Sequence, residues 1–411
     1  MLDINYIREN TEEVKKKVAS KNFDPKIVDE VLKLDENRRK LLTEIEELRA
    51  ERNDAAKNKN IEKGKDLKEK LQKLEPESEK ANQEFTQKLN EVPNLPADDV
   101  KIGKGEDENE EIKKWGDIKK FDFEAKDHLT LGTNLGILDF ESGAKVTGSQ
   151  FYYLIGDGAL LELALIHYAF EILTKEGFTP IITPDLAKSR YYLGTGYLPK
   201  GDEAQTYEIK DSDLGLIATA EVTLAGRHAD EVIPENKLPI KYIGYSHCFR
   251  QEGGAYGKYS RGLYRVHQFS KAEMFVYCKP GDSDKMHDYL LGLEEKIYQG
   301  LGIPYRVLKQ CTGDLGAIAA RKYDIEAWMP GRGEYGEVTS TSNCTDYQAR
   351  NLNIKYRTKQ NKNEYIHMLN GTAIATSRVP VAILENYQNE DGSVDIPKVL
   401  QKWMGKNKIS K

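Results

Sequence analysis

The sequence predicts an α+β fold, in which helices pack on an antiparallel sheet and an N-terminal pair of helices forms a separate arm. Three observations predict this fold. Residues 27–92 carry apolar side chains at heptad spacing, which is typical of a coiled coil. Residues 126–411 mix strand-like and helical stretches without a regular β-α-β repeat, which favours an antiparallel sheet over a doubly wound one. Residues 101–125 hold turn-forming residues and an acidic run.

The arm is predicted from heptad series on both sides of a polar turn near residues 58–64. The apolar heptad positions are Ile27, Val31, Leu34, Leu41, Ile45, Leu48 and Ala55 before the turn, and Leu67, Leu71, Leu74, Ala81, Phe85 and Val92 after it. Two such helices form an antiparallel hairpin, about 45–50 Å long at a rise of 1.5 Å per residue. Pro76 lies within the second helix, where proline kinks a helix or begins a fresh turn.

The distal part of the arm, residues 49–73, is basic. It holds nine Lys and Arg against five Asp and Glu, a net +4, whereas the whole chain is −6 and the remainder is therefore −10. Because the overall charge does not recruit RNA, a nucleic-acid contact must come from a local patch such as this one. A solvated helix face that binds nothing carries the same kind of charge run, and the arm alone does not decide between the two.

The composition of residues 93–125 is that of a linker, with prolines, glycines and several consecutive acids. We therefore divide the chain into an N-terminal helical domain at 1–100, a linker at 101–125 and a body at 126–411. In the body we expect strands at 238–250, 263–278, 334–342 and 365–374, and helices near 159–176, 283–301 and 380–388.

The most informative stretch is 242–278, which has the pattern of two strands joined by a glycine-rich loop. Side chains two residues apart share a strand face, which predicts Arg250 beside Glu252 on the first strand. On the second strand, the predicted polar face is Arg265, His267, Phe269, Lys271 and Glu273, and the apolar face is Val266, Ala272, Met274 and Val276. The apolar face is expected to be buried, while the other offers cations, carboxylates and an aromatic ring.

The loop of this hairpin suits a phosphate group. It contains Gly253, Gly254, Gly257 and Gly262, together with Lys258 and Arg261. Arginine binds phosphate bidentately, and an aromatic ring offers a surface on which a base stacks. The hairpin therefore predicts a nucleotide site, although a charged sheet face is also typical of plain solvation.

Two other polar groups have structural and functional interpretations that the residues leave open. Thr219, Ala220 and Glu221 place a hydroxyl and a carboxylate in an apolar stretch. They fit a helix N-terminus capped by Thr219 as well as a binding loop. The segment from Asn370 to Arg378 leads into a helix, and proline near that helix's first turn is favourable.

The bulk properties predict a cytosolic protein. No apolar run approaches the ~18 residues of a membrane helix, and the N-terminus lacks the pattern of a signal or transit peptide. The four cysteines lie 30–33 residues apart without a C-x-x-C pair, which argues against disulfides and gives no zinc signature. Buried, reduced thiols are expected, and a zinc site that uses Cys248 and Cys311 is the alternative.

The hairpin motif FRQE, followed by GG, a basic loop, RGLYRVHQF and KAE, resembles motif 2 of the class II aminoacyl-tRNA synthetases. The variant is that of the seryl-tRNA synthetases of the bacterial type. Seven further segments resemble this family in the same order along the chain: MLDINYIREN, GSQFYYLIGDGALLELAL, TGYLPK, TAEV, CTGDLG, SNCTDYQAR and NGTAIATSRVPVAILENYQ. The resemblance covers essentially the whole chain.

The resemblance implies a class II catalytic sheet flanked by helices. It implies an enzyme that activates L-serine with ATP to seryl-adenylate and transfers the seryl group to the 3′ end of serine tRNA, with selenocysteine tRNA left open as a second acceptor. It further implies Mg²⁺, a cytoplasmic homodimer and an arm that grips the long variable arm of serine tRNA through shape and backbone. In such a dimer the arm of one subunit presents tRNA to the site of the other.

The same resemblance assigns roles to individual residues. Arg250 would bridge the serine carboxylate and the α-phosphate, Glu252 would accept from the adenine amino group, and Phe269 would stack on the ring. Arg261 and Arg378 would bind the outer phosphates, with Gln251, Val338 and Thr339 as further ATP contacts. The serine contacts would be Thr219, Ala220, Glu221, Arg250, Glu273 and Thr372. The family pattern does not allocate the amine and the hydroxyl of serine between the two acids.

Glu337 and Ser340 would be the hard oxygen ligands of Mg²⁺ that bridges the ATP phosphates. The two residues are an odd number of positions apart, so a regular strand would point them to opposite faces. A bulge or a strand end is required, and without the resemblance this segment reads as an edge strand.

Departures from the family pattern leave the main charged groups in place. Thr372 stands where serine is usual, Ala218 where proline is common, and Lys258-Tyr259-Ser260 where Arg-Asp-Thr is usual. Two rival functions are an amino-acid-activating relative that serves a carrier protein and a non-catalytic RNA-binding paralogue. The full arm argues against the first, and the intact Arg250, Glu252, Glu337 and Arg378 argue against the second.

Overall fold

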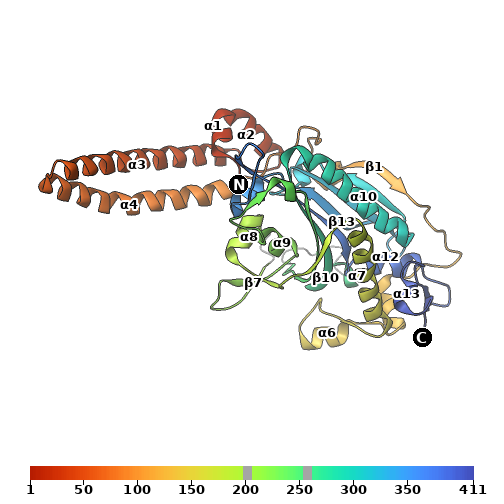
Figure 1. Ribbon diagram of the computed structural model, residues 1–411. Coiled ribbons are helices and arrows are strands. Elements are labelled where there is room, and N and C mark those ends of the chain that lie inside the picture. Colours follow the sequence, from red (N-terminus) through yellow and green to blue (C-terminus); the bar gives the residue numbers. More distant parts are fainter. Residues whose placement is uncertain (198–205, 253–261) are drawn as a thin grey trace. The chain divides into compact units, whose positions relative to one another are not determined.

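The structure is a computed structural model that describes residues 1–197, 206–252 and 262–411. The chain divides into two compact units, Met1–Leu95 and Pro96–Lys411, each of which is described by itself (Figure 1). The predicted loop residues Gly253, Gly254, Gly257, Lys258 and Arg261 lie outside the described residues. Among the helices that are described, none is long and apolar enough to cross a membrane.

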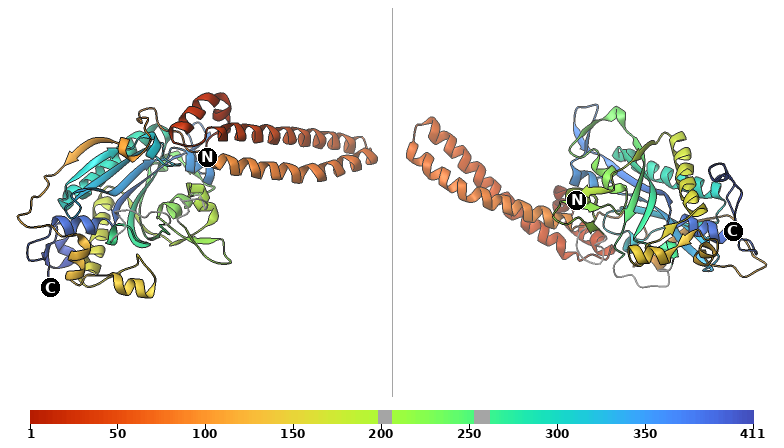
Figure 2. Two further views of the ribbon diagram at one scale, coloured as in Figure 1. Left: turned by 180° about the vertical axis from the view of Figure 1, so that it is seen from behind. Right: turned by 90° about the horizontal axis from the view of Figure 1, so that it is seen from below.

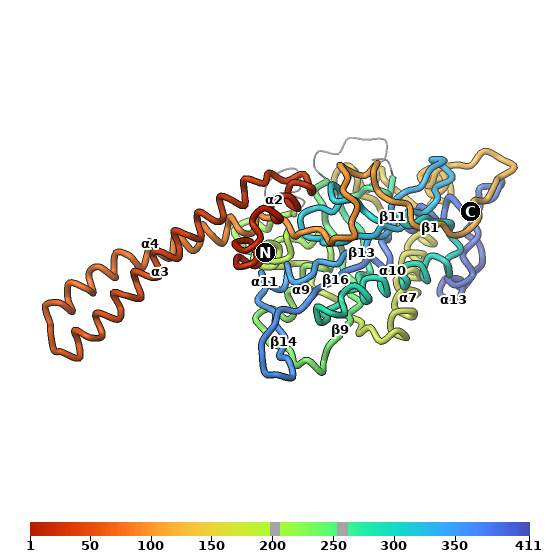
Figure 3. The backbone as a smooth tube through the Cα atoms, turned by 90° about the horizontal axis from the view of Figure 1, so that it is seen from above, coloured from red at the N-terminus to blue at the C-terminus, as the bar shows by residue number. Residues whose placement is uncertain are grey.

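The first unit is helical and contains the predicted hairpin. Two short helices, α1 (Ile4–Glu9) and α2 (Thr11–Ser20), precede the long helices α3 (Lys26–Lys57) and α4 (Ile61–Asn90). Figure 3 shows α3 and α4 running side by side in opposite directions. The turn is shorter than predicted, because the side chain of Asn60 accepts from the Lys63 backbone N–H at 3.1 Å and caps α4 from that position.

The seam between α3 and α4 follows the heptad prediction with local differences. The buried apolar side chains are Val28, Val31, Leu41, Ile45, Ala55, Leu67, Leu71, Ala81, Phe85 and Leu89. Leu34, Leu48 and Leu74 are only half-buried. α4 continues through Pro76 as one helix, so the proline does not begin a new one.

A carboxylate occupies the seam where the heptad pattern expects Leu34. Asp35 is fully buried, and its oxygens lie 3.2 Å from Arg8 Nε, 2.9 Å from Arg38 Nη2 and 3.0 Å from Arg39 Nε. A buried charge is tolerated when it is paired and hydrogen-bonded, and here three guanidinium groups compensate for the loss of water.

The second unit is built on an eight-stranded sheet (Figure 2). Its strands, in order across the sheet, are β1 (Glu110–Trp115), β11 (Tyr305–Lys309), β12 (Arg321–Met329), β13 (Glu334–Asn343), β16 (His367–Ala375), β10 (Gln268–Cys278), β9 (Ile240–Phe249) and β4 (Thr179–Ile182). All neighbouring pairs are antiparallel except β4 and β9. The antiparallel sheet that the sequence predicts is therefore confirmed.

Part of the expected linker forms a strand. Residues 110–115 lie in the expected linker, yet they form β1 and pair with β11 at the edge of the sheet. The strand is short and mostly charged, and such side chains suit an exposed sheet edge as well as a linker. Composition alone therefore could not separate the two.

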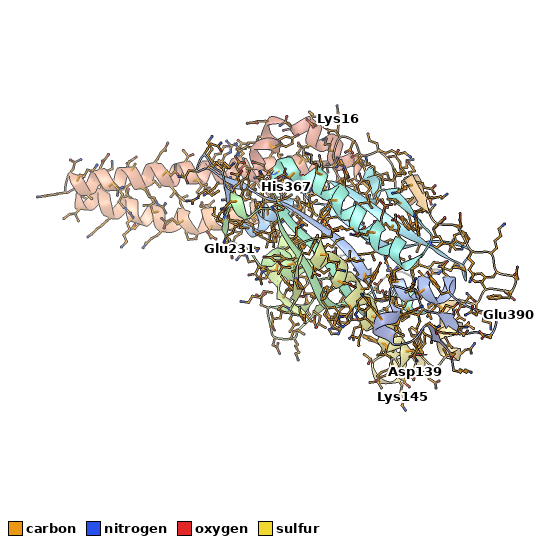
Figure 4. The ribbon with its side chains drawn as sticks, turned by 45° about the vertical axis from the view of Figure 1, so that its right-hand side comes forward. Lys16, Asp139, Lys145, Glu231, His367 and Glu390 are labelled. Carbon is orange, nitrogen blue, oxygen red and sulfur yellow. The ribbon has the colours of Figure 1, made fainter. Side chains whose placement is uncertain are left out.

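Helices α7 (Asp157–Lys175), α10 (Ser283–Leu301) and α12 (Val379–Asn386) share one hydrophobic core with the sheet. Met274 and Val276 of β10 lie in this core, as the strand pattern predicts. β16 begins at His367 (Figure 4), whose Nδ1 lies 2.9 Å from the hydroxyl of Ser283 at the start of α10. A second core joins α9 (Glu221–Gly226) and α11 (Tyr347–Leu352) to Phe275 and Tyr277 of β10, which point away from Met274.

The four strands and three helices expected in the body are all present, and β10 begins at Gln268 instead of near 263. The other α-helices of the second unit, within the described residues, are α5 (His128–Asn134), α6 (Phe140–Val146), α8 (Ser189–Thr195) and α13 (Gln401–Met404). The remaining strands are β2 (Leu138–Asp139), β3 (Tyr153–Leu154), β5 (Leu186–Lys188), β6 (Tyr207–Glu208), β7 (Leu214–Leu216), β8 (Val232–Pro234), β14 (Lys355–Arg357), β15 (Asn363–Tyr365), β17 (Val394–Asp395) and β18 (Lys408–Ile409).

Candidate active site

A cavity of about 720 Å³ lies over the face of the sheet that α7 and α10 leave open. β10 contributes Phe269, Lys271 and Glu273 to its lining, and these residues alternate with the buried Ala272 and Met274. The odd-numbered face of this strand, predicted to be polar, is thus the one that faces the cavity. Further lining comes from β12, β13 and β16 and from the segments that follow α8 and β9.

At one end of the cavity, Glu221 is held by three neighbours. Its Oε1 accepts from Gln348 Nε2 at 2.7 Å and from Asn370 Nδ2 at 2.9 Å, and its Oε2 accepts from the Tyr197 hydroxyl at 3.3 Å. Glu221 opens α9, and Thr219 Oγ1 accepts from its backbone N–H at 3.2 Å. The segment does begin a helix, as one of the two interpretations holds, but Ala220 is the N-cap residue instead of Thr219, and the Glu221 carboxylate faces the cavity.

The pKa of Glu221 lies near neutral pH. Burial and the neighbouring Glu273 carboxylate raise its pKa to about 7, although the bond from Gln348 opposes that rise. Glu273 is itself buried and forms an ion pair with Lys271, and its Oε2 accepts from the Thr372 hydroxyl at 3.4 Å. This end of the cavity therefore offers two carboxylates against one ammonium group, a surplus of negative charge that suits a cationic amine.

The centre of the cavity is formed by Arg250 and Phe269. The Arg250 guanidinium lies 5.2 Å from the centre of the Phe269 ring, and its Nε donates to the carbonyl of Ala218 at 3.4 Å. The strand prediction for Arg250 and Glu252 needs correction, because β9 ends at Phe249. Arg250 N–H still donates to the His267 carbonyl at 2.9 Å, but Glu252 has a left-handed backbone with φ 48°.

Beyond the strand end, Glu252 still lines the cavity and forms an ion pair with Arg265. Arg265 and His267 precede β10 and do not belong to its alternating face. Val266 likewise packs with Cys248 and Phe269 instead of with Met274. The predicted alternation fails here because the chain turns before the strand begins.

The opposite end of the cavity contains Glu337 and Arg378. Arg378 Nη1 donates to Glu337 Oε1 at 2.6 Å. Burial in the cleft opposes ionisation of Glu337, but Arg378 and Lys322 outweigh it and hold the pKa of Glu337 below its ordinary value. Tyr264 donates to the backbone carbonyl of Glu337 at 2.9 Å, and its ring lies 5.2 Å from the Arg378 guanidinium.

A bulge brings Glu337 and Ser340 to the same cavity. Along β12 and β13, Thr339 pairs with Ile325 and Glu337 pairs with the next residue, Glu326, so that Val338 has no partner. Such an extra residue reverses the alternation beyond it. Both Glu337 and Ser340 line the cavity in consequence, which meets the condition that the sequence set for them.

Not every predicted site residue faces the cavity. Val338, Thr339 and Thr372 line it. Gln251 donates its amide to the Thr206 carbonyl at 2.9 Å and is not among the lining residues, while Thr219 and Ala220 are buried behind it. Arg261, predicted to bind an outer phosphate, lies outside the described residues.

Several cavity residues on β12 were missed by the sequence interpretation. Lys322 and Glu326 line the cavity, and burial raises the pKa of Asp324 between them to about 6. These three charged residues alternate with Tyr323, Ile325 and Ala327, which is the signature of a strand with one polar face. This alternation was the available signal. Gln348 and Asn370 gave no comparable signal, because only the tertiary fold brings them to Glu221.

The donor set at Glu337 and Ser340 fits Mg²⁺. Both residues supply oxygen atoms, and Mg²⁺ is commonly held by one or two protein oxygens together with substrate phosphates. Elsewhere, the part of the chain that the structure describes holds no group of three or more His, Cys, Asp and Glu placed to bind a metal. All four cysteines are buried and unpaired by disulfides, with Cys311 Sγ donating to the Gly105 carbonyl at 3.3 Å.

Comparison with known proteins gives matches over both units. Residues 1–96 match the seryl-tRNA synthetase N-terminal domain, and residues 206–387 match the class II tRNA synthetase core domain (G, H, P, S and T). The chain is 55% identical over 421 aligned positions to the serine–tRNA ligase of Dictyoglomus turgidum, covering 100% of this chain and 99% of that one. It is 48% identical to that of Treponema denticola, covering 100% of both.

Solved structures give the same picture. The seryl-tRNA synthetase of Pyrococcus horikoshii, complexed with ATP, superposes with a TM-score of 0.93 at 43% identity, covering 100% of this chain and 99% of that one. The cytoplasmic serine–tRNA ligase of Naegleria fowleri, in complex with AMP, superposes with a TM-score of 0.88 at 36% identity over 100% and 99% of the two chains.

Proposed function

The chain belongs to the seryl-tRNA synthetase family of class II aminoacyl-tRNA synthetases, and we propose that the cavity described above is where it activates serine. The protein is a serine–tRNA ligase, which uses ATP to form seryl-adenylate and then transfers the seryl group to serine tRNA. The observation that carries the proposed site is the placement of two carboxylates at one end of a single cavity and of Arg250 and Arg378 along it.

In the proposed reaction, Glu221 and Glu273 attract the serine ammonium, and the Thr372 hydroxyl forms a hydrogen bond with the serine hydroxyl. Arg250 turns from the Phe269 ring to the serine carboxylate and the α-phosphate, which leaves the ring as a stacking surface for adenine. The carboxylate oxygen then attacks the α-phosphorus in line, the bond to pyrophosphate breaks, and the terminal ribose hydroxyl of tRNA later displaces AMP. Positioning and charge neutralisation provide most of the acceleration.

The outer phosphates belong at the other end of the cavity. Arg378 and Glu337 bind one another in the structure, and we propose that Arg378 exchanges this partner for the γ-phosphate. Glu337 and Ser340 are then available to hold Mg²⁺, which when bound neutralises charge between the phosphates. Glu252 would read the adenine amino group.

The arm is the proposed tRNA-binding element. Within the described part of the chain, five cations of its distal segment form no ion pair: Arg52, Lys59, Lys65, Lys68 and Lys73. Unpaired, exposed cations on a helical hairpin suit a phosphate backbone, because each contact releases counterions. We place the helical tRNA-binding domain at 1–100 and the catalytic domain at 126–411, with the β1 strand as an added part of the catalytic sheet.

The proposed homodimer is supported by exposed apolar side chains on α7 and on the edge strand β4. Leu160 and Leu163 of α7 are 43% and 54% exposed, and Ile182 of β4 is 79% exposed. A neighbouring groove of about 510 Å³ includes Phe170 and Trp403. A sheet edge and an apolar patch of this kind mark an interface, and the occupant we propose is a second copy of the chain in a cytoplasmic dimer.

A charge placed on this surface is expected to separate the subunits. Leu163→Glu combined with Ile182→Lys buries charges at the proposed interface, and we expect a monomer by light scattering at micromolar concentration. Ile61→Glu, at an equally exposed position (73%) at the start of α4, is the matched control and should stay dimeric. A double variant that elutes with the mass of the parent dimer would rule out this surface.

Serine-dependent exchange of pyrophosphate into ATP, followed by charging of serine tRNA, tests the proposed function. Both activities should require serine and Mg²⁺. A protein that binds serine tRNA but exchanges no pyrophosphate would instead be the non-catalytic paralogue.

Selectivity for serine over alanine and threonine is expected to arise in the cavity itself. Alanine leaves groups that face the serine hydroxyl, such as Thr372, without a partner, and sites of this kind reject the dehydroxylated analogue by roughly 10⁴-fold. Threonine is excluded only by fit around its extra methyl, which is worth ~1–3 kcal/mol, so it should be the worse contaminant. Pyrophosphate exchange at matched concentrations measures both. Alanine activated as well as threonine, or either approaching serine, would contradict this account of the pocket.

A further inference from the structure

Gln348 lies where α8, α9 and α11 meet, behind the amino-acid end of the cavity. Its side chain is fully buried, and its amide nitrogen donates to Glu221 Oε1 at 2.7 Å and to the backbone carbonyl of Thr195 at 3.1 Å. Gln348 Oε1 has no hydrogen-bond partner among the described residues. The opposite orientation of the amide would place this oxygen against two acceptors, so the two donated bonds fix the side chain as it stands.

Both acceptors of Gln348 are negative. Thr195 is the last residue of α8, and the final carbonyls of a helix lack intrahelical partners and carry partial negative charge. The Glu221 carboxylate approaches the same place from α9. One neutral amide satisfies both through its two N–H groups, whereas a lysine or arginine here would cancel the charge of Glu221.

We propose that Gln348 is a positioning residue for serine recognition, which fixes the Glu221 carboxylate and preserves its negative charge for the substrate ammonium. Gln348 and Asn370 occupy Oε1 from the protein side. Among the described residues, the one hydrogen bond to Oε2 is the longer, 3.3 Å bond from Tyr197, which itself lines the cavity, so Oε2 is the oxygen left for serine. This inference rests on the proposed function of the cavity and adds to it a residue outside its lining.

The surroundings of Glu221 predict how its titration responds to Gln348. Within the described residues, Glu221 is faced by Glu273 and Lys271 from β10, the Tyr197 hydroxyl beyond α8 and the neutral amides of Asn370 and Gln348. Arg250, beyond β9, acts on Tyr197, and the Cys344 thiol lies 3.8 Å from the Asn370 amide. Donation from Gln348 stabilises the ionised carboxylate and so lowers the pKa of Glu221. Removal of this donor therefore raises the pKa, and a higher pH is needed to ionise Glu221.

Gln348→Met, which keeps the volume and removes the donors, tests the inference. We expect the KM for serine in pyrophosphate exchange to rise roughly 10- to 100-fold, the range for a lost hydrogen bond to a charged group, while the KM for ATP stays within about twofold. The pH midpoint of kcat/KM for serine should move upward from the wild-type value. Calorimetric titration with serine alone should show the same loss of affinity.

Two further variants make the test decisive. Gln388→Met removes an equally buried amide that donates to the carbonyls of Lys126 and Glu385, neither of which contacts Glu221, and it should leave the serine KM and the pH midpoint unchanged. Gln348→Glu keeps the shape and adds a carboxyl beside Glu221, so it should also move the midpoint upward if the methionine variant does not fold.

A Gln348 variant that unfolds at lower temperature but keeps the wild-type serine KM and pH midpoint would overturn the inference and leave only a structural role. If the wild-type protein itself shows no serine-dependent exchange, the proposed function fails instead.

Discussion

Replacement of Arg250 by lysine is expected to reduce serine-dependent pyrophosphate exchange by ~100-fold or more. That is the scale of loss when one preorganised donor to a transition state is removed. Lysine keeps the positive charge but loses the planar fork that binds a carboxylate and a phosphate together. In the structure, Arg250 is the cation at the centre of the cavity, held over Phe269 and by the carbonyl of Ala218.

The control for this prediction is Arg227→Lys. Arg227 also places its guanidinium over an aromatic ring, 5.5 Å from the centre of Tyr242, but it does not line the cavity. Its replacement should leave the exchange rate within about twofold. An Arg250→Lys protein within threefold of the parent would show that Arg250 is not the central cation of adenylation.

Removal of the distal arm should abolish aminoacylation and leave adenylation nearly intact. The deletion runs from Glu46 to Lys73, with a short Gly/Ser linker between the two helices. The 2.9 Å ion pair of Arg49 with Glu75 shows that the cut ends lie close together. Adenylation should survive because every residue that lines the cavity belongs to the unit Pro96–Lys411.

A charge-reversal variant separates the loss of binding from the loss of the helices. Lys65→Glu and Lys68→Glu change two unpaired, exposed cations of α4 and keep the hairpin. We expect weaker tRNA binding with a shallower dependence on salt, since each phosphate contact contributes to that slope. Loss of pyrophosphate exchange in a deletion protein that is still a folded dimer would contradict the division of labour between the two units.

The parts of this fold that the sequence could predict are those with a periodic signal. The heptads of α3 and α4 and the two-residue alternation at Phe269, Lys271 and Glu273 are local patterns, and each led to the correct element and face. The alternation of charged and apolar residues along β12 is a local pattern of the same kind, but the sequence interpretation did not use it. The charged strand β1 has no such pattern, because an edge strand in solvent and a linker have similar compositions.

The site was predictable only in part, for a physical reason. Glu221, Glu273, Arg250, Glu337 and Arg378 do line one cavity, as the resemblance implied. Glu221 is held by Gln348 of α11, Asn370 of β16 and Tyr197 beyond α8. Only the tertiary fold brings these three together, and a buried amide has no sequence signature of its own. The odd spacing of Glu337 and Ser340 required a bulge or a strand end, but it could not show where in β13 the extra residue lies.

A crystal structure with seryl-sulfamoyl-adenosine, in which a sulfamoyl group replaces the phosphate of the adenylate, would show which groups of the cavity hold serine and adenosine. We expect the ammonium between Glu221 and Glu273, the adenine on the Phe269 ring, and Arg250 at the sulfamoyl group and the seryl carbonyl. Electron density for the analogue outside the cavity, or with the seryl amine turned away from both carboxylates, would contradict this placement.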